Sequence, residues 1–131
     1  MWASYNGHEG AVRLLLARDD INLDRPGPHD QTSLWGASFK GREGVVRLLL
    51  TRDDVDPDKP DKDGKTPLWW ASRWGDEVVV KLLLLQGDAN PNILDSGGIT
   101  PLRSASFHGH QGVVRLLTLP RLYQSRQTRQ R

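Results

Sequence analysis

DKDGKTPLWWASRWGDEVVVKLLLLQGDANPNIL, residues 61–94, is one complete copy of a unit that recurs along the chain. Identical or similar residues return every 34 positions at several unrelated places in the unit. The matched sets are Ala3, Ala37, Ala71 and Ala105; Ser4, Ser38, Ser72 and Ser106; Gly7, Gly41, Gly75 and Gly109; Arg13, Arg47, Lys81 and Arg115; Leu15, Leu49, Leu83 and Leu117. Such agreement indicates a tandem array, which has to be considered before any single globular fold.

The first half of the unit predicts a short helix. The hydroxyl of Thr66 can cap a helix, and Pro67 suits the first helical position, where no backbone donor is needed. We expect this helix to run from 67 to about 74. Gly75 would end it, because glycine accepts the left-handed conformation common at helix ends.

The second half predicts another helix, from about 77 to 85, with Gly87 ending it. Its apolar residues fall at helical spacing, which gives one stripe to bury: Val79, Val80, Leu83 and Leu84. One helix pair cannot bury this stripe by itself, whereas stacked copies can. The pattern therefore predicts an all-α solenoid of helix-turn-helix units with long hairpin-like loops.

The start of each first helix resembles the signature of a known family. TPLWWAS at 66–72, TSLWGAS at 32–38 and TPLRSAS at 100–106 are similar to the ankyrin-repeat motif Thr-Pro-Leu-His-x-Ala, and GHEGAVRLLL at 7–16 is similar to that family's second helix. The resemblance covers residues 1 to about 119. The tetratricopeptide repeat shares the period, but its Trp/Leu-Gly/Tyr pattern is absent.

Ankyrin repeats usually have a period of about 33 residues, so this chain carries one additional residue per unit, which we place in the segment 53–58. This variant resembles the arrays of large fungal sensor proteins of the NACHT or signal-transduction ATPase (STAND) type.

Two departures from the motif predict weaker points. The resemblance implies that the signature His helps to tie neighbouring turns, and Trp35, Trp69 and Arg103 replace it here. Asp30 stands where the other copies have glycine, and Ser33 stands where they have proline. Because Asp tolerates left-handed geometry better than most residues, we expect repeat 2 to fold with a weaker start.

The chain divides into four copies and a tail. We expect a partial repeat 1 with its loop at 1–28, repeat 2 at 29–60, repeat 3 at 61–94, a partial repeat 4 at 95–119, and a basic, disordered tail at 120–131. Copy one begins inside a helix, so the chain reads as an interior slice of a longer solenoid. Its ends would then expose apolar residues and favour self-association: Ala3, Val12 and Leu15 at one end, Val114 and Leu117 at the other.

Composition excludes several function classes. The chain has no cysteine, a net charge of +2 and no apolar run approaching the ~18 residues of a membrane span. No signal-peptide pattern is present, so we expect an intracellular, cytoplasmic protein without a membrane partner.

Metal and catalytic sites are also not expected. The acidic run at 53–63 invites a calcium interpretation, but the position of the closing ligand falls on Trp70. His108 and His110 lack further ligands for zinc. With no phosphate loop or acid/base constellation, we expect no metal, no cofactor and no enzymatic activity.

The expected activity is binding of a protein partner. The resemblance implies that the two positions before each turn glycine face a concave groove where partners dock. These positions, together with the tip of the loop of repeat 3, are the predicted partner-binding residues: Tyr5, Asn6, Phe39, Lys40, Arg73, Trp74, Phe107, His108, Lys62, Asp63 and Lys65. One aromatic per repeat would make a continuous stripe, whereas Trp35 and Trp69 are expected in the core.

Other interpretations remain open. The chain could serve as a structural segment that spaces or regulates other domains, or it could bind nucleic acid weakly through the arginines of its tail, although nucleic acid is not the partner class we expect. The charge pairs Glu9–Arg13, Glu43–Arg47 and Glu77–Lys81 stand four residues apart on the second helices. We interpret them as a solvated face.

Overall fold

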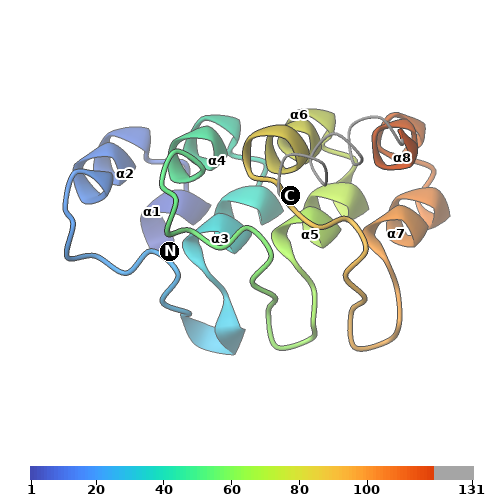
Figure 1. Ribbon diagram of the computed structural model, residues 1–131, viewed down its shortest axis with the longest axis horizontal. Helices are drawn as coiled ribbons and strands as arrows, with labels where there is room; N and C mark the ends of the chain where they lie inside the picture. The colour runs from blue at the N-terminus through green and yellow to red at the C-terminus, as the bar shows by residue number, and fades with distance from the viewer. Residues whose placement is uncertain (120–131) are drawn as a thin grey trace, which may run out of the picture.

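The helices of the chain form two parallel rows (Figure 1). The computed structural model describes residues 1–119, which contain eight α-helices and no strand, and the expected all-α fold is confirmed. One row holds α1 (Trp2–Tyr5), α3 (Ser33–Phe39), α5 (Pro67–Trp74) and α7 (Pro101–Phe107). The other holds α2 (Glu9–Leu16), α4 (Glu43–Leu49), α6 (Glu77–Lys81) with its continuation η2 (Leu82–Gln86), and α8 (Gln111–Thr118). A short 3-10 turn, η1 (Pro28–Asp30), lies in the first long loop.

The first helices begin as the sequence predicts. Thr32, Thr66 and Thr100 each accept, through the side-chain oxygen, the backbone N–H of the residue three positions on, at 3.1 Å. Gly75 ends α5 in the left-handed region, with φ of 75°. In repeat 2, Asp30 takes the left-handed conformation expected of it, with φ of 61°.

The second helix of repeat 3 ends at Gly87, as predicted, but the left-handed residue is the next one. Gly87 has an ordinary right-handed φ of −86°, and Asp88 instead adopts the left-handed conformation, with φ of 57°. The helix widens into the π-helical turn η2, where the Gly87 N–H donates to the Leu82 carbonyl at 3.0 Å. A side chain at Gly87 would come within 2.9 Å of Leu50 Cδ2, so packing against repeat 2 explains this glycine.

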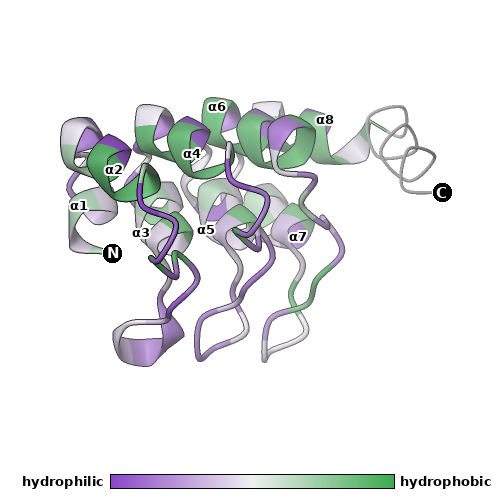
Figure 2. Ribbon diagram, turned by 60° about the vertical axis from the view of Figure 1, so that its left-hand side comes forward, coloured by the Kyte–Doolittle hydropathy of each residue, from purple (hydrophilic) through white to green (hydrophobic). Residues whose placement is uncertain are grey.

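A continuous apolar core lies between the two rows of helices. Its fully buried members come from all four repeats and include Val12, Leu34, Val45, Val46, Leu49, Leu68, Val79, Val80, Leu83 and Val113. Burying each such side chain is worth about 1.5–3 kcal/mol, and no single repeat supplies enough of them. The loops, by contrast, are mostly hydrophilic (Figure 2).

The expected exposure of apolar residues at the two ends is largely wrong. Val12 is 2% exposed, and Ala3, Val114 and Leu117 are partly buried against the core. Of the five residues named, only Leu15 is exposed, at 39%. Each end helix is covered on its inner side by the neighbouring repeat and by its own partner helix, which the sequence pattern alone does not reveal.

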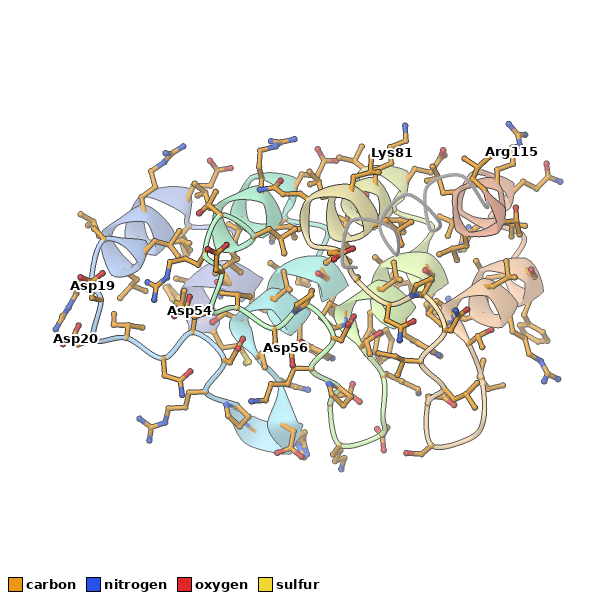
Figure 3. All side chains as sticks on the ribbon, in the orientation of Figure 1. Asp19, Asp20, Asp54, Asp56, Lys81 and Arg115 are labelled. Carbon is orange, nitrogen blue, oxygen red and sulfur yellow. The ribbon has the colours of Figure 1, made fainter. Side chains whose placement is uncertain are left out.

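The predicted charge pairs along the second helices do not form. Within residues 1–119, the ion pairs are Arg18–Asp20 and Arg52–Asp54. Figure 3 shows Lys81 and Arg115 pointing away from the helices. The Glu77 carboxylate instead lies over Gly112 of the next repeat, as Glu9 lies over Gly44, because a glycine there leaves room for it.

The acidic loop segments form a ladder of hydrogen bonds between repeats. The Asp56 N–H donates to both carboxylate oxygens of Asp24, at 2.9 and 3.1 Å, and the Asn90 N–H donates to Asp58 Oδ1 at 2.9 Å. Asp56 Oδ1 accepts the Asp58 N–H at 2.9 Å within its own loop. These carboxylates therefore satisfy backbone donors. Burial raises the pKa of Asp58 to about 6, against the lowering effect of its bond from Asn90.

None of the helices in residues 1–119 is long and apolar enough to cross a membrane. The predicted tail, 120–131, lies outside the residues that the structure describes.

Candidate functional site: the aromatic surface of the first helices

Six rings from the first three repeats make one cluster on the row of first helices. This aromatic cluster consists of Tyr5, Trp35, Phe39, Trp69, Trp70 and Trp74. Phe39 is at its centre: its ring stacks on Trp35 at a centroid distance of 4.8 Å. It also makes T-shaped contacts with Trp70 and Trp74, at centroid distances of 4.8 and 5.7 Å. Aromatic pairs in such geometries contribute beyond the area they bury, so the cluster joins repeats 1 to 3.

Asp61 lies at the base of the cluster and binds two indoles at once. Its Oδ2 accepts Trp35 Nε1–H at 2.9 Å and Trp70 Nε1–H at 3.0 Å. Its Oδ1 accepts the N–H groups of Asp63 and Lys65, both at 3.0 Å. Although Asp61 is only 8% exposed, four donors satisfy its carboxylate, which is the condition for burying a charge.

The tie between repeats 2 and 3 is therefore present despite the loss of the signature His. Trp35 replaces that His and reaches the hairpin turn of the next repeat through its indole N–H. The prediction that replacing the signature His weakens the contact between neighbouring repeats is wrong at this junction. Trp35 is also buried, as predicted for the core.

The junction between repeats 3 and 4 lacks the same tie. Trp69 is the counterpart of Trp35 and is 7% exposed, as expected of a core residue, but its Nε1 is buried with no hydrogen-bond partner. Asp95 is the counterpart of Asp61, and its Oδ1 accepts the N–H groups of Gly97 and Ile99 at 2.9 Å. Within residues 1–119 no indole donates to Asp95. The counterpart of Trp70 is Ser104.

The three groove aromatics named from the sequence differ in exposure. Phe39 is partly buried inside the cluster, Trp74 is 48% exposed and Phe107 is 85% exposed. The rings of Tyr5, Phe39 and Trp74 follow one another, but Phe107 contacts the ring of His108 and no ring of the cluster. The expected continuous stripe thus stops at Trp74, and Phe107 lies beyond the break.

Cationic side chains lie over four rings of the cluster. Arg73 is 4.6 Å from the centroid of Trp74, and Lys40 Nζ is 5.3 Å from that of Tyr5. Lys65 Nζ is 4.6 Å from the centroid of Trp69 and also lies over Trp70. Three of the predicted polar site residues therefore border the aromatic surface.

The other predicted polar residues make local contacts. Asn6 Nδ2 donates to the Trp2 carbonyl at 2.9 Å, and His108 Nδ1 is 2.8 Å from the Ser104 carbonyl. Lys62 and Asp63 join adjacent hairpin tips through their backbones: the Lys62 N–H donates to the His29 carbonyl, and the Asp63 carbonyl accepts the Ser96 N–H, both at 2.9 Å. The side chains of Lys62 and Asp63 are exposed.

Sequence reasoning missed two members of the surface, Trp70 and Asp61. Trp70 precedes Trp74 by four residues, so the two rings share one face of α5, and their centroids are 6.1 Å apart. Asp61 opens the hairpin turn of its repeat, as Asp95 does in the next, whereas repeat 2 has Gly27 at this position. The spacing of Trp70 and Trp74 and the recurrence of aspartate at 61 and 95 were the signals in the sequence that could have identified these two residues.

Two clefts open between the first helices. The cleft between repeats 2 and 3 has a volume of about 270 Å³ and is lined in part by Trp35, Asp61 and Trp70. The cleft between repeats 3 and 4 is larger, about 400 Å³. Within residues 1–119, no group of three His, Cys, Asp or Glu side chains is placed to hold a metal ion.

Comparison with known proteins agrees with this architecture. A family model described as "Ankyrin repeats (3 copies)" matches residues 34–124, which is most of the chain, and the pair α1–α2 precedes the matched region. No curated protein matches the chain. Ankyrin repeats generally act as protein–protein interaction modules. With four stacked helix pairs and this match, the chain belongs to the ankyrin-repeat family.

Proposed function

We propose that this chain is a non-catalytic module that binds a polypeptide partner through the aromatic surface of its first helices and the adjoining hairpin tips. The contact would centre on Trp74 and Phe107, with Phe39, Tyr5 and the neighbouring polar residues at its border. The observation that carries this proposal is the exposure of two large rings, 48% for Trp74 and 85% for Phe107, on one row of helices.

The residue types on this surface suit a protein interface. Aromatic and arginine side chains supply most of the energetically dominant contacts in protein complexes. Trp74 has Arg73 over its ring and makes a T-shaped contact with Phe39, so both contacts hold its position before a partner binds. A fixed side chain loses less conformational entropy on binding than a mobile one.

The hairpin tips extend the surface with charge. Lys62 and Asp63 are exposed, while their backbones are tied to the neighbouring tips. These side chains are rim residues, which affect association rates and selectivity more than affinity.

The proposal is tested by affinity capture from the native source with the double variant Trp74→Ala, Phe107→Ala. The matched control is Leu14→Ala, Val78→Ala, which removes exposed apolar side chains from the second helices. We expect the wild type and the control to retain the same partners and the groove variant to lose them. Equal capture by the groove variant, with helicity unchanged by circular dichroism, would discard the proposal.

Phe39 needs a separate variant. Its ring is packed among Trp35, Trp70 and Trp74, so its truncation would disturb the fold as well as the surface. Adding Phe39→Ala to the double variant is informative only where thermal unfolding shows that the protein remains folded.

A further inference from the structure

The repeats provide an internal comparison for one position of the first helix. Trp70 occupies it in repeat 3, and Ser104 occupies it in repeat 4. At the earlier junction the Trp70 indole lies beside Trp35 and Phe39, with ring centroids 6.2 and 4.8 Å away, and donates to Asp61. At the later junction, serine leaves this volume unfilled.

We propose that the cleft between α5 and α7 binds an indole side chain of the partner, which would take the place that Trp70 takes one repeat earlier and donate its N–H to Asp95. The inference rests on the proposed function and specifies which side chain the partner presents. The residues that line the cleft include Lys65, Trp69, Asp95, Ile99, Arg103 and Phe107. Its volume of about 400 Å³ falls within the range of ~300–1,000 Å³ typical of small-ligand pockets.

Two of the residues that line this cleft carry an unpaired buried polar atom. Trp69 Nε1 and Ser104 Oγ are both buried without a hydrogen-bond partner. Buried donors are nearly always satisfied in folded proteins, and each exception calls for an explanation. At the earlier junction one carboxylate oxygen accepts both indoles. An arriving indole would draw Asp95 into the same arrangement with Trp69.

The chemistry of the cleft favours a neutral aromatic donor, and the place of Trp70 one repeat earlier points to an indole among such donors. Trp69, Ile99 and Phe107 give it apolar walls, which suit an aromatic ring. Asp95 offers an acceptor, which phenylalanine cannot use. Lys65 and Arg103 outnumber Asp95 at the rim, so a cationic side chain would meet net repulsion. A neutral aromatic donor satisfies all three conditions, and the indole of tryptophan is one.

The test is a titration of the ¹⁵N-labelled protein with N-acetyl-L-tryptophanamide, followed by NMR. We expect shifts at the Trp69 indole N–H and the Ile99 amide. N-acetyl-L-phenylalaninamide, which lacks the donor, should bind about tenfold more weakly, as expected for one hydrogen bond to a charged group. Shifts elsewhere only, or equal binding of both compounds, would overturn the proposal.

Three variants test whether the compound binds in the cleft between α5 and α7. Ser104→Trp supplies the indole from the chain itself and should abolish binding of the compound. The matched control Ser106→Trp adds the same ring to an exposed position of α7 and should leave binding unchanged. Asp95→Asn provides a second, milder variant and should weaken binding about tenfold.

A second copy of the chain is the competing source of an indole. Trp2 is 70% exposed and would be the residue inserted. In that case the Trp69 indole signal would depend on protein concentration, and Trp2→Ala would abolish that dependence. This result would overturn the proposal of a separate partner, because a second copy of the chain would then supply the indole. A failed titration would leave the capture experiment with Trp74 and Phe107 unaffected, so the two proposals fail separately.

Discussion

The junction between repeats 2 and 3 is tied by the chain's own indoles and keeps a cleft of about 270 Å³, whereas the junction between repeats 3 and 4 lacks this tie and has a larger cleft of about 400 Å³. The two junctions are built from equivalent helices and equivalent hairpin turns: α3 and α5 form the first, and α5 and α7 form the second. At the first, Asp61 accepts the indoles of Trp35 and Trp70. At the second, Ser104 replaces the outer indole, and Trp69 keeps an unpaired N–H. Two positions therefore distinguish the junctions: Ser104 stands in place of Trp70, and Arg73 stands in place of Phe39.

The largest effect is expected where the two junctions share a core. Leu83 is fully buried in the middle of the stack, and Leu83→Ala should lower the free energy of unfolding by about 2–5 kcal/mol. Its counterpart in repeat 1 is Leu15, which is exposed, so Leu15→Ala should cost clearly less. Chemical denaturation measures both. Equal losses of unfolding free energy in the two variants would contradict the difference in burial between Leu83 and Leu15.

The next effect separates the junctions directly. Asp61→Ala removes the acceptor of two indoles as well as two bonds within its turn, and it should cost about 3 kcal/mol more than Asp95→Ala, because a hydrogen bond to a charged group is worth about 1.5–3 kcal/mol. Asp95→Ala loses only the two bonds within its turn, which Asp61→Ala loses as well, so it should be the less costly change. Denaturation of the two variants in parallel gives the difference. Indistinguishable values would contradict the contrast between the junctions.

A smaller effect is expected in the loop that joins repeats 2 and 3. The pKa of Asp58 is raised to about 6 by burial, above the ~3.9 of an unfolded chain. The folded state therefore binds more protons between these values, and the contribution of Asp58 to stability falls as pH rises from about 4 to 6.

Asp58→Asn should accordingly raise stability at pH 7 by about 1 kcal/mol, a value reduced to allow for the partial exposure of the group. Asparagine can still accept the Asn90 N–H, and the next repeat already has Asn92 at this position. Thermal unfolding at pH 7 and pH 4 provides the check. The variant should match the wild type at pH 4, where both side chains are neutral, and a gain at pH 4 would rule out this cause.

The smallest effect concerns the outer helices of both junctions. No ion pair forms within residues 1–119 between Glu43 and Arg47 or between Glu77 and Lys81. A double-mutant cycle on either pair should give a coupling below about 0.3 kcal/mol, at the lower limit for such pairs on helices. A coupling near 1 kcal/mol at either pair would show that an ion pair contributes there.

The architecture could be predicted from the sequence because the residues that determine it recur every 34 positions. The threonine caps, the glycine after α5 and the buried stripe of each second helix all follow from local rules that act within one unit. The buried state of Trp35 and Trp69 also follows, since both stand at the position of the signature residue.

What could not be predicted depends on contacts between units. The sequence indicates only that Asp61 lies in a turn. Its hydrogen bonds from two indoles of different repeats exist only in the stacked structure. The charge pairs of the second helices failed for the same reason: Glu9 and Glu77 reach the next repeat rather than their own helix. The role of Gly87 was likewise set by Leu50 of the preceding repeat.

The most direct test of the contrast is the indole region of the ¹H–¹⁵N NMR spectrum for the wild type, Asp61→Asn and Asp95→Asn. We predict downfield, hydrogen-bonded indole N–H signals for Trp35 and Trp70 that move when Asp61 is changed. The Trp69 signal should lack this downfield position and stay in place when Asp95 is changed. A downfield Trp69 signal that moves with Asp95→Asn would mean that both junctions carry an indole–carboxylate hydrogen bond and would contradict the account.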